Sequence, residues 1–376
     1  MRGIPVYRQV ELRGVAEPAT TLQNAIDTCQ SEGGGRVQIG AGEAYLSQAV
    51  IVRPGAAVVL AGEGRSTVLA VDGSHFALSL EGSYIDVRDL CLASRGGWPG
   101  GISLYRASTN ISISDVWWGS GFSMGLYAAP VGPGTVGIYR FERLRWDAVN
   151  QTGTAIQIGN GVQHVSDVSL TQVSGTAIAQ NGITSWLMIA RDTDTIQLDH
   201  VTFYGGEHGI QAGAGTDPAK TITGLSITQS VLENFATEGL AIVKAQDVRL
   251  HNVEMAQSQR AIWLGPGVRG ASIQQCTLQA HRGTAVDVSG ARMVDIAHCL
   301  IQDNNSENGP YGFGVSLAGA REFSITDNMI GNGLWGGGGY QKVGIMVDAN
   351  CRDYVLSGNR GTNQQSLISD WGRPNG

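Results

Sequence analysis

The sequence predicts an all-β solenoid, in which the chain winds through short strands in successive, similar coils. The clearest sign lies between residues 239 and 316, where one pattern begins three times, at Leu240, Ile262 and Val286. Short strands separated by Gly, Asn, Ser and Pro turns recur about every 22–30 residues, a period typical of solenoids. Apolar and polar residues alternate with a period of two, which indicates strands rather than helices. The 54 glycines agree with this fold, because tight turns need positive φ angles.

The chain is expected to form one solenoid domain, because each coil contacts only its neighbours and length therefore sets no limit. Residues 1–17 show no clear pattern and are predicted to form an N-terminal arm. Residues 18–360 carry the coils, and residues 361–376 lose the pattern and are predicted to form a polar C-terminal tail.

An amphipathic helix is predicted at the start of the solenoid, from about residue 18 to residue 29. Its apolar stripe consists of Leu22, Ala25, Ile26 and Cys29. Thr20 or Thr21 is expected to cap its N-terminus. The end of a solenoid leaves its core open, and we expect this helix to cover it.

The composition argues against nucleic acid and membranes as partners. The formal net charge is −7, and lysine and arginine form no cluster along the sequence. No apolar run reaches the length of about 18 residues that a membrane span needs. Residues 1–5 also lack the apolar core of a signal peptide.

The five cysteines are expected to be reduced. Cys276 and Cys299 occupy the same place in consecutive coils, so their thiols should stack inside the solenoid at the rung spacing of about 4.8 Å. We expect buried, apolar thiols rather than disulfides or metal ligands, and no spacing of cysteines or histidines points to zinc.

Three segments near the N-terminus are similar to the opening of a known family. They read Leu22-Gln23-x-Ala25-Ile26-Asp27, Gly33-Gly34-Gly35-x-Val37-x-Ile39 and Ala61-Gly62-Glu63-Gly64-x-Ser66-Thr67-Val68-Leu69. They resemble pectate-lyase-like right-handed parallel β-helices, as found in polysaccharide-degrading tailspikes of bacteriophages and in related glycosidases, lyases and epimerases. The resemblance implies one right-handed parallel β-helix, here of about 11–12 coils. It also implies a polysaccharide substrate, a homotrimer, and a virion-associated or otherwise extracellular location.

One file of outward-pointing residues is predicted along the solenoid, because the middle residue of the first strand in each coil should face solvent. The file consists of Ser103, Tyr127, Gln157, Met188, Gln211, Ala241, Trp263, Asp287, Ser316 and Met346. Aromatic rings stack on sugar rings, and amides and carboxylates bind hydroxyl groups, so this file suits a sugar polymer. An ordinary solvated surface explains it equally well.

The turns between strands carry acidic residues that suit glycosidic cleavage. Glu207, Glu233, Glu238 and Glu254 are expected to stack on one face within a few rungs. Hydrolysis of a glycoside needs two carboxyl groups, about 5–5.5 Å apart for retention or about 6.5–9.5 Å apart for inversion. One or two rungs of about 4.8 Å deliver such separations.

The leading hypothesis is a tailspike-like depolymerase that cleaves a bacterial surface polysaccharide. Glu207 with Glu233 or Glu254 would be the acid–base pair, assisted by His208 and Tyr204. The predicted sugar-binding residues are Trp117, Trp118, Gln211, Glu238, Trp263, Arg282 and Asp287.

Two other classes of protein fit the same sequence. A lyase or epimerase would need a base and a charge neutraliser, such as Tyr204 or His208 with Arg282. A non-catalytic glycan-binding or structural β-helix would spread its acids over different faces. No cofactor is expected, although the oxygens of Asp192 and Asp194 could bind calcium.

Overall fold

The structure, a computed structural model, describes most of the chain. The described residues are 6–97, 99–106, 108–130, 136–149, 153–177, 183–214, 217, 219–307, 312–332, 341–362 and 364–371. The chain divides into two compact units, Met1–Leu187 (unit 1) and Met188–Gly376 (unit 2). Strands make up almost all of the regular structure in both units.

In its described residues, unit 1 contains one α-helix, one 3-10 turn and a series of short strands. These are β1 (Val6–Val10), α1 (Pro18–Ser31), β2 (Gly35–Ile39), β3 (Gly42–Leu46), β4 (Val50–Val52), β5 (Val58–Ala61), η1 (Gly64–Ser66), β6 (Thr67–Val71), β7 (Phe76–Leu80), β8 (Ile85–Ser94), β9 (Gly100–Ser103), β10 (Thr109–Trp118), β11 (Met124–Ala128), β12 (Val136–Glu142), β13 (Arg145–Val149), β14 (Thr154–Ile158), β15 (Val165–Thr171) and β16 (Ser174–Ala177). The division between the units falls within β17 (Ser185–Ala190).

The predicted helix is present as α1, and its apolar stripe packs on β1 to β4. Leu22, Ile26 and Cys29 are fully buried, as the pattern predicted. The predicted threonine cap is wrong, because α1 starts at Pro18, whose fixed φ suits the first helical position. Thr20 is instead inside the first turn, where its hydroxyl donates to the Glu17 carboxylate at 3.0 Å.

Part of the predicted N-terminal arm is a rung of the solenoid. β1 pairs in parallel with β2, with Val6 opposite Gly35 and Val10 opposite Ile39. Residues 6–10 form a single strand of five residues before the helix, which is too short for its alternation to predict a rung. Residues 1–5 lie outside the described residues.

Unit 2 consists of strands and turns in the residues that the structure describes. The strands are β18 (Thr193–Asp199), β19 (Thr202–Tyr204), β20 (His208–Ala214), β21 (Ile222–Thr228), β22 (Val231–Glu233), β23 (Glu238–His251), β24 (Glu254–Ala256), β25 (Arg260–Gln274), β26 (Thr277–Gln279), β27 (Val286–Ser289), β28 (Arg292–Ala297), β29 (Leu300–Gln302), β30 (Phe313–Ala318), β31 (Arg321–Thr326), β32 (Met329–Gly331), β33 (Val343–Val347), β34 (Arg352–Ser357), β35 (Arg360–Thr362) and β36 (Ser366–Asp370).

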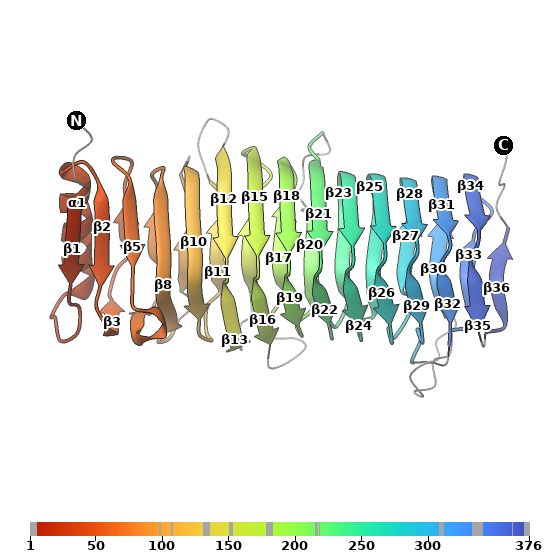
Figure 1. The fold of residues 1–376 in the computed structure, drawn as a ribbon, viewed down its shortest axis with the longest axis horizontal. Helices are drawn as coiled ribbons and strands as arrows, with labels where there is room; N and C mark the ends of the chain where they lie inside the picture. The colour runs from red at the N-terminus through yellow and green to blue at the C-terminus, as the bar shows by residue number, and fades with distance from the viewer. Residues whose placement is uncertain are drawn as a thin grey trace. The chain divides into compact units, whose positions relative to one another are not determined.

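The strands of unit 2 stack in parallel into three ladders, each visible in Figure 1 as a row of successive arrows. The β18 ladder contains β18, β21, the second halves of β23 and β25, β28, β31 and β34. The β19 ladder contains β19, β22, β24, β26, β29, β32 and β35. The β20 ladder contains β20, the first halves of β23 and β25, β27, β30, β33 and β36.

The ladders extend past residue 360, where the sequence placed the end of the coils. β36 pairs in parallel with β33, with Ile368 opposite Ile345, so part of the predicted polar tail is a further rung. Residues 372–376 lie outside the described residues.

One turn is repeated from coil to coil between the β18 and β19 ladders. A residue with positive φ occupies it each time: His200 (52°), Gln229 (47°), Asn252 (53°), Gln275 (54°), His298 (55°), Asp327 (55°) and Gly358 (65°). A single left-handed residue bends the chain sharply without a long loop. The constant turn keeps the register of the β19 ladder from one rung to the next.

The cysteine prediction is confirmed for the stacked pair. All five cysteines are free, and Cys276 and Cys299 are 1% and 2% exposed. Both follow the repeated turn, and each thiol donates to the backbone carbonyl two residues before it, at 3.3 Å.

In the described part of the chain, no helix has the length and apolar character that crossing a membrane would demand.

Candidate functional site

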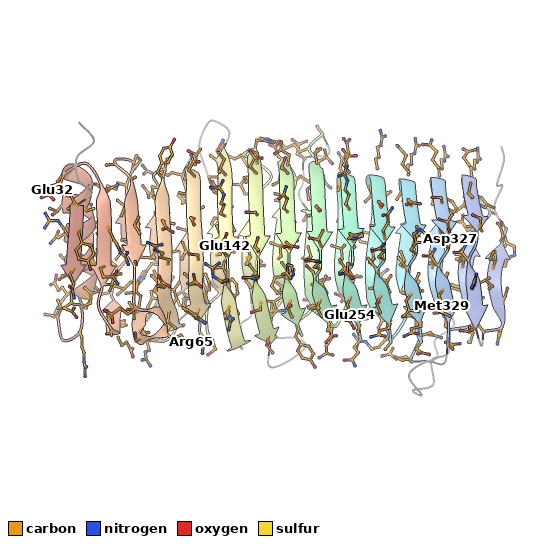
Figure 2. The ribbon with its side chains drawn as sticks, viewed as in Figure 1. Glu32, Arg65, Glu142, Glu254, Asp327 and Met329 are labelled. Carbon is orange, nitrogen blue, oxygen red and sulfur yellow. The ribbon has the colours of Figure 1, made fainter. Side chains whose placement is uncertain are left out.

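Unit 2 carries two adjoining hollows on the face of the β19 ladder. The first, of about 440 Å³, is lined by Glu233, Glu254, Ala256, Gln257, Gln279, Ala280, Asp303 and Ser306, and is called here the β19-face hollow. The second, of about 350 Å³, is lined by His200, Gln229, Ser230, Val231, Asn252, Val253, Glu254 and Thr277. Glu254, labelled in Figure 2, belongs to both and therefore stands at their junction.

Glu233 and Glu254 share one face of adjacent rungs. Glu233 lies opposite Ala256 of the next strand, and Glu254 precedes Ala256 by two residues. Residues two apart on a strand point to the same side. One rung and two residues separate the two Cα atoms by about 8 Å, so the carboxyl groups can serve one substrate.

The two carboxyl groups differ in their surroundings. Burial, and then the charge of Glu254, raise the pKa of Glu233 above its ordinary value. The Glu254 carboxylate accepts a hydrogen bond of 3.1 Å from the Gln279 amide, which in turn accepts one of 3.1 Å from Gln302. No ion pair joins Glu233 or Glu254 to another residue within the described ranges.

The face of the β20 ladder carries a second pair of hollows. One, of about 200 Å³, is lined by His208, Gln211, Ala212, Ala214, Glu238, Ala241, Val243, Arg260 and Trp263. The other, of about 490 Å³, is lined by Gln259, Arg260, Gly283, Thr284, Asp287, Phe313, Ser316 and Met346. Arg260 joins them, and together they are called here the β20-face groove.

An ion-pair network holds the acids of the β20-face groove. Arg260 donates to the Glu238 carboxylate with one terminal nitrogen and to Asp287 with the other, at 2.9 Å. His208 lies with its Nδ1 3.0 Å from Oε2 of Glu238. Burial would raise the pKa of Glu238, but the hydrogen bonds from His208 and Arg260 and the positive charge of Arg260 lower it to about 2. Glu238 is therefore a fixed anion.

The neighbours of His208 define which ring nitrogen carries the proton when the ring is neutral. The Thr237 hydroxyl donates its proton to the Glu207 carbonyl, at 2.8 Å. Its oxygen lies 2.6 Å from His208 Nδ1 and therefore accepts a hydrogen bond from that ring nitrogen. Glu238 also accepts at Nδ1. The lone pair is then on Nε2, which lies 3.7 Å from the half-exposed Glu207 carboxylate. This nitrogen is placed to take a proton.

Comparison with known families and structures identifies the fold. Residues 185–361 match the family described as "Right handed beta helix region". The chain is a right-handed parallel β-helix. A comparison with curated protein sequences gave no match.

Solved structures of other β-helix proteins are similar to this β-helix over most of the chain. The A-module of the mannuronan C-5 epimerase AlgE6 from Azotobacter vinelandii has a TM-score of 0.64 and 16% identity over 96% of each chain. The tailspike receptor-binding protein of bacteriophage Det7 has a TM-score of 0.66 and 10% identity, over 97% of this chain and 75% of that chain. Pre-mature gene product 12 of bacteriophage phi29 has a TM-score of 0.69 and 13% identity, over 96% of this chain and 57% of that chain. At these identities the likeness concerns the fold.

The β-helix separates glutamates that the sequence placed together. Glu233 and Glu254 lie on the β19 ladder with Tyr204, which is opposite Glu233 in the preceding rung. Glu207 and Glu238 lie beside His208 at the β20 ladder. The expectation of one shared face is wrong, because the turn between Glu233 and Glu238 carries the chain from one ladder to the next.

The predicted file is confirmed as a stack of register partners along the β20 ladder. The expectation that its members face solvent is wrong for Ala241 and Ser103, which are 6% and 2% exposed. Gln211, Ala241, Trp263, Asp287, Ser316 and Met346 are register partners on successive rungs. Gln211 and Trp263 line the smaller hollow, and Asp287 lines the larger.

Trp118 is a core residue of unit 1 rather than a surface for sugars. Its side chain is 1% exposed and stacks on Trp146 with ring centroids 4.3 Å apart. Trp117 is half-buried under the guanidinium of Arg65, 5.4 Å from its ring centroid. The alternation of Val116 and Trp118 with Trp117 already favoured this arrangement.

Arg282 supports a turn. Its guanidinium donates to the carbonyls of Phe235 at 2.8 Å and Ala236 at 2.6 Å. The cation of the β20-face groove is Arg260, which the sequence analysis missed. Arg260 is opposite Glu238 in the next rung, so the register was the signal that could have found it.

Asp192 and Asp194 are the two acids that the sequence offered for calcium. Asp192 forms an ion pair of 2.7 Å with Lys220. Among the described residues, no three or more His, Cys, Asp or Glu side chains are grouped to hold a metal ion.

Proposed function

We propose that this β-helix is a polysaccharide depolymerase that hydrolyses glycosidic bonds with Glu233 and Glu254. The observation that carries the proposal is the unequal pair of carboxyl groups in the β19-face hollow. A glycosidase needs one carboxyl group that stays protonated and one that is ionised. The raised pKa of Glu233 suits the first role, and the amide hydrogen bond to Glu254 suits the second.

In this mechanism Glu233 donates its proton to the glycosidic oxygen as the bond to the leaving sugar breaks. Glu254 either attacks the anomeric carbon itself, or takes a proton from the water whose oxygen bonds to that carbon. The position of Glu254 at the junction of two hollows gives room for a sugar on each side of the cleaved bond.

The structural neighbours support a polysaccharide as the substrate class. They include a tailspike receptor-binding protein and a mannuronan epimerase, both built on this fold. By the same likeness we propose a homotrimer in an extracellular or virion-associated setting.

A second candidate reaction is proton transfer at a sugar ring carbon in the β20-face groove, as in a lyase or epimerase. The observation that favours it is the contact of His208 Nδ1 with Glu238, which puts the lone pair of the neutral ring on Nε2, as a base needs. Arg260 would be the cation for a substrate anion, although both of its terminal nitrogens are already paired with carboxylates.

Incubation with a panel of bacterial capsules and other neutral and acidic polysaccharides tests the proposal. Hydrolysis produces new reducing ends without ultraviolet absorbance from unsaturated sugars. New absorbance would assign the reaction to elimination, whereas altered sugar configuration without shorter chains would indicate epimerisation. Binding without any chemical change would leave a glycan-binding protein. Each of these last three results contradicts the hydrolase.

A further inference from the structure

We infer that the sugar unit seated in the β19-face hollow carries no negative charge and presents hydrogen-bond donors, as a neutral hexose or an amino sugar does. This inference rests on the proposed function and adds the substrate class to it. It excludes a uronate at that position.

The charge of the lining is the first reason. The described lining residues contribute three carboxyl groups, from Glu233, Glu254 and Asp303. None of these described lining residues is a lysine, an arginine or a histidine. A uronate would bring a further negative charge among these groups. Two like charges about 4 Å apart repel each other substantially, and more so where water is excluded.

The supply of hydrogen-bond acceptors is the second reason. Gln302 is 3% exposed, and its Oε1 has no hydrogen-bond partner in the described part of the chain. Its amide nitrogen donates to Gln279, whose own amide nitrogen donates to Glu254. Gln302 is the register partner of Gln279, which lines the hollow. A buried acceptor beside the hollow favours a ligand that supplies a donor.

The β20-face groove shows how this chain stabilises carboxylates. In the β20-face groove the Glu238 and Asp287 carboxylates are both held by Arg260. No such cation lines the β19-face hollow among the described residues. The hollow is thus left for a substrate without negative charge.

Asp303 offers a test that leaves the proposed acid–base pair intact. It lines the hollow, is 7% exposed, and has a positive φ of 53°, a conformation that asparagine adopts well. Asp303→Asn keeps the shape of the side chain and removes one charge. Asp167→Asn, at an exposed position of unit 1 with a φ of 54°, is the matched control.

The experiment measures binding of matched neutral, amino and uronate oligosaccharides by calorimetry, with Glu233→Gln as the background so that no cleavage occurs. We expect neutral or amino sugars to bind and uronates to bind at least about five-fold more weakly. Asp303→Asn should reduce this gap about two-fold or more, because the carboxyl group of Glu254 remains, and Asp167→Asn should leave it unchanged.

Tighter binding of uronates than of neutral sugars, or a gap that Asp303→Asn leaves unchanged, would overturn the inference. The proposed function is judged separately, by cleavage with the wild-type protein. Cleavage that depends on Glu233 but prefers uronate polymers would reject the substrate class and keep the hydrolase. Selective binding of neutral sugars without cleavage of any polymer would reject the hydrolase and keep the substrate class.

Discussion

The β19 face and the β20 face of unit 2 are built alike, but the carboxyl groups on the two faces have different electrostatic surroundings. Each joins two hollows at one charged side chain, Glu254 on the β19 ladder and Arg260 on the β20 ladder. On the β20 face, Arg260 fixes Glu238 as an anion with a pKa of about 2. On the β19 face, no ion pair with a described cation holds Glu233, and its pKa is raised by burial and by the charge of Glu254.

This difference shows that partners, rather than residue type, decide what a carboxyl group can do. A glutamate paired with arginine organises its neighbours and exchanges no proton near neutral pH. A glutamate that is partly buried beside a second carboxylate can hold a proton and deliver it. The proposed chemistry therefore belongs to the β19 face, and the ion-pair network belongs to the β20 face.

The largest expected effect is on catalysis. Glu233→Gln removes the proposed proton donor and should lower the rate of depolymerisation by about 10²- to 10⁴-fold. Glu254→Gln should do the same. His208→Gln and Glu142→Gln, at a half-exposed position of unit 1, should keep most of the activity, as measured by the release of reducing ends. If His208→Gln were the inactive variant, the two faces would have been assigned the wrong roles.

The second-largest expected effect is on the free energy of unfolding. Replacing a glutamate by glutamine should destabilise the protein on the β20 face but not on the β19 face. The Glu238 side chain is only 8% exposed, and its folded-state pKa lies below the value in an unfolded chain. A lowered carboxyl pKa contributes stability that is fully present above about pH 4.3 and is lost as the pH falls towards 2. Glu238→Gln should therefore lower the free energy of unfolding by about 3 kcal/mol at pH 7.

Denaturant unfolding at pH 7 and at pH values between about 4 and 2 measures this loss, which should shrink in acid. Glu233→Gln is the matched variant on the other face. Because its raised pKa disfavours the ionised form in the folded protein, this variant should be neutral or slightly stabilising at pH 7. Equal losses from both variants would remove the electrostatic distinction between the faces.

The smallest expected effect is a change in the pKa of Glu233. The charge of Glu254 contributes to the raised pKa of Glu233, after burial. Glu254→Gln should therefore lower the pKa of Glu233 while leaving it above the ordinary value. Carbon-13 NMR of the labelled glutamate carboxyls measures the shift, with Glu142→Gln as the control. An unchanged pKa would mean that the two carboxyl groups do not act as a pair.

The architecture could be predicted from the sequence because its determinants are local. The alternation of apolar and polar residues sets which side chains share a face, so the file from Gln211 to Met346 was predicted correctly as a stack of register partners. The stacked Cys276 and Cys299 followed from the same repeat. Strands 6–10 and 366–370 were missed because each is a single short segment beside an irregular one.

The candidate site could be predicted only in part, because its geometry depends on contacts between rungs. Glu233 and Glu238 are five residues apart, and the turn between them puts them on different ladders. Arg260 acquires its role only through its register with Glu238, 22 residues away. Sequence alternation alone does not fix which turn leads to which face.

The most direct test of the assignment is a crystal structure of Glu233→Gln with a bound oligosaccharide of a cleaved polysaccharide. We expect a sugar chain on the β19 face, with one unit in each hollow and the glycosidic bond between Glu254 and residue 233. A chain bound only along Trp263 and Arg260 of the β20-face groove would contradict it.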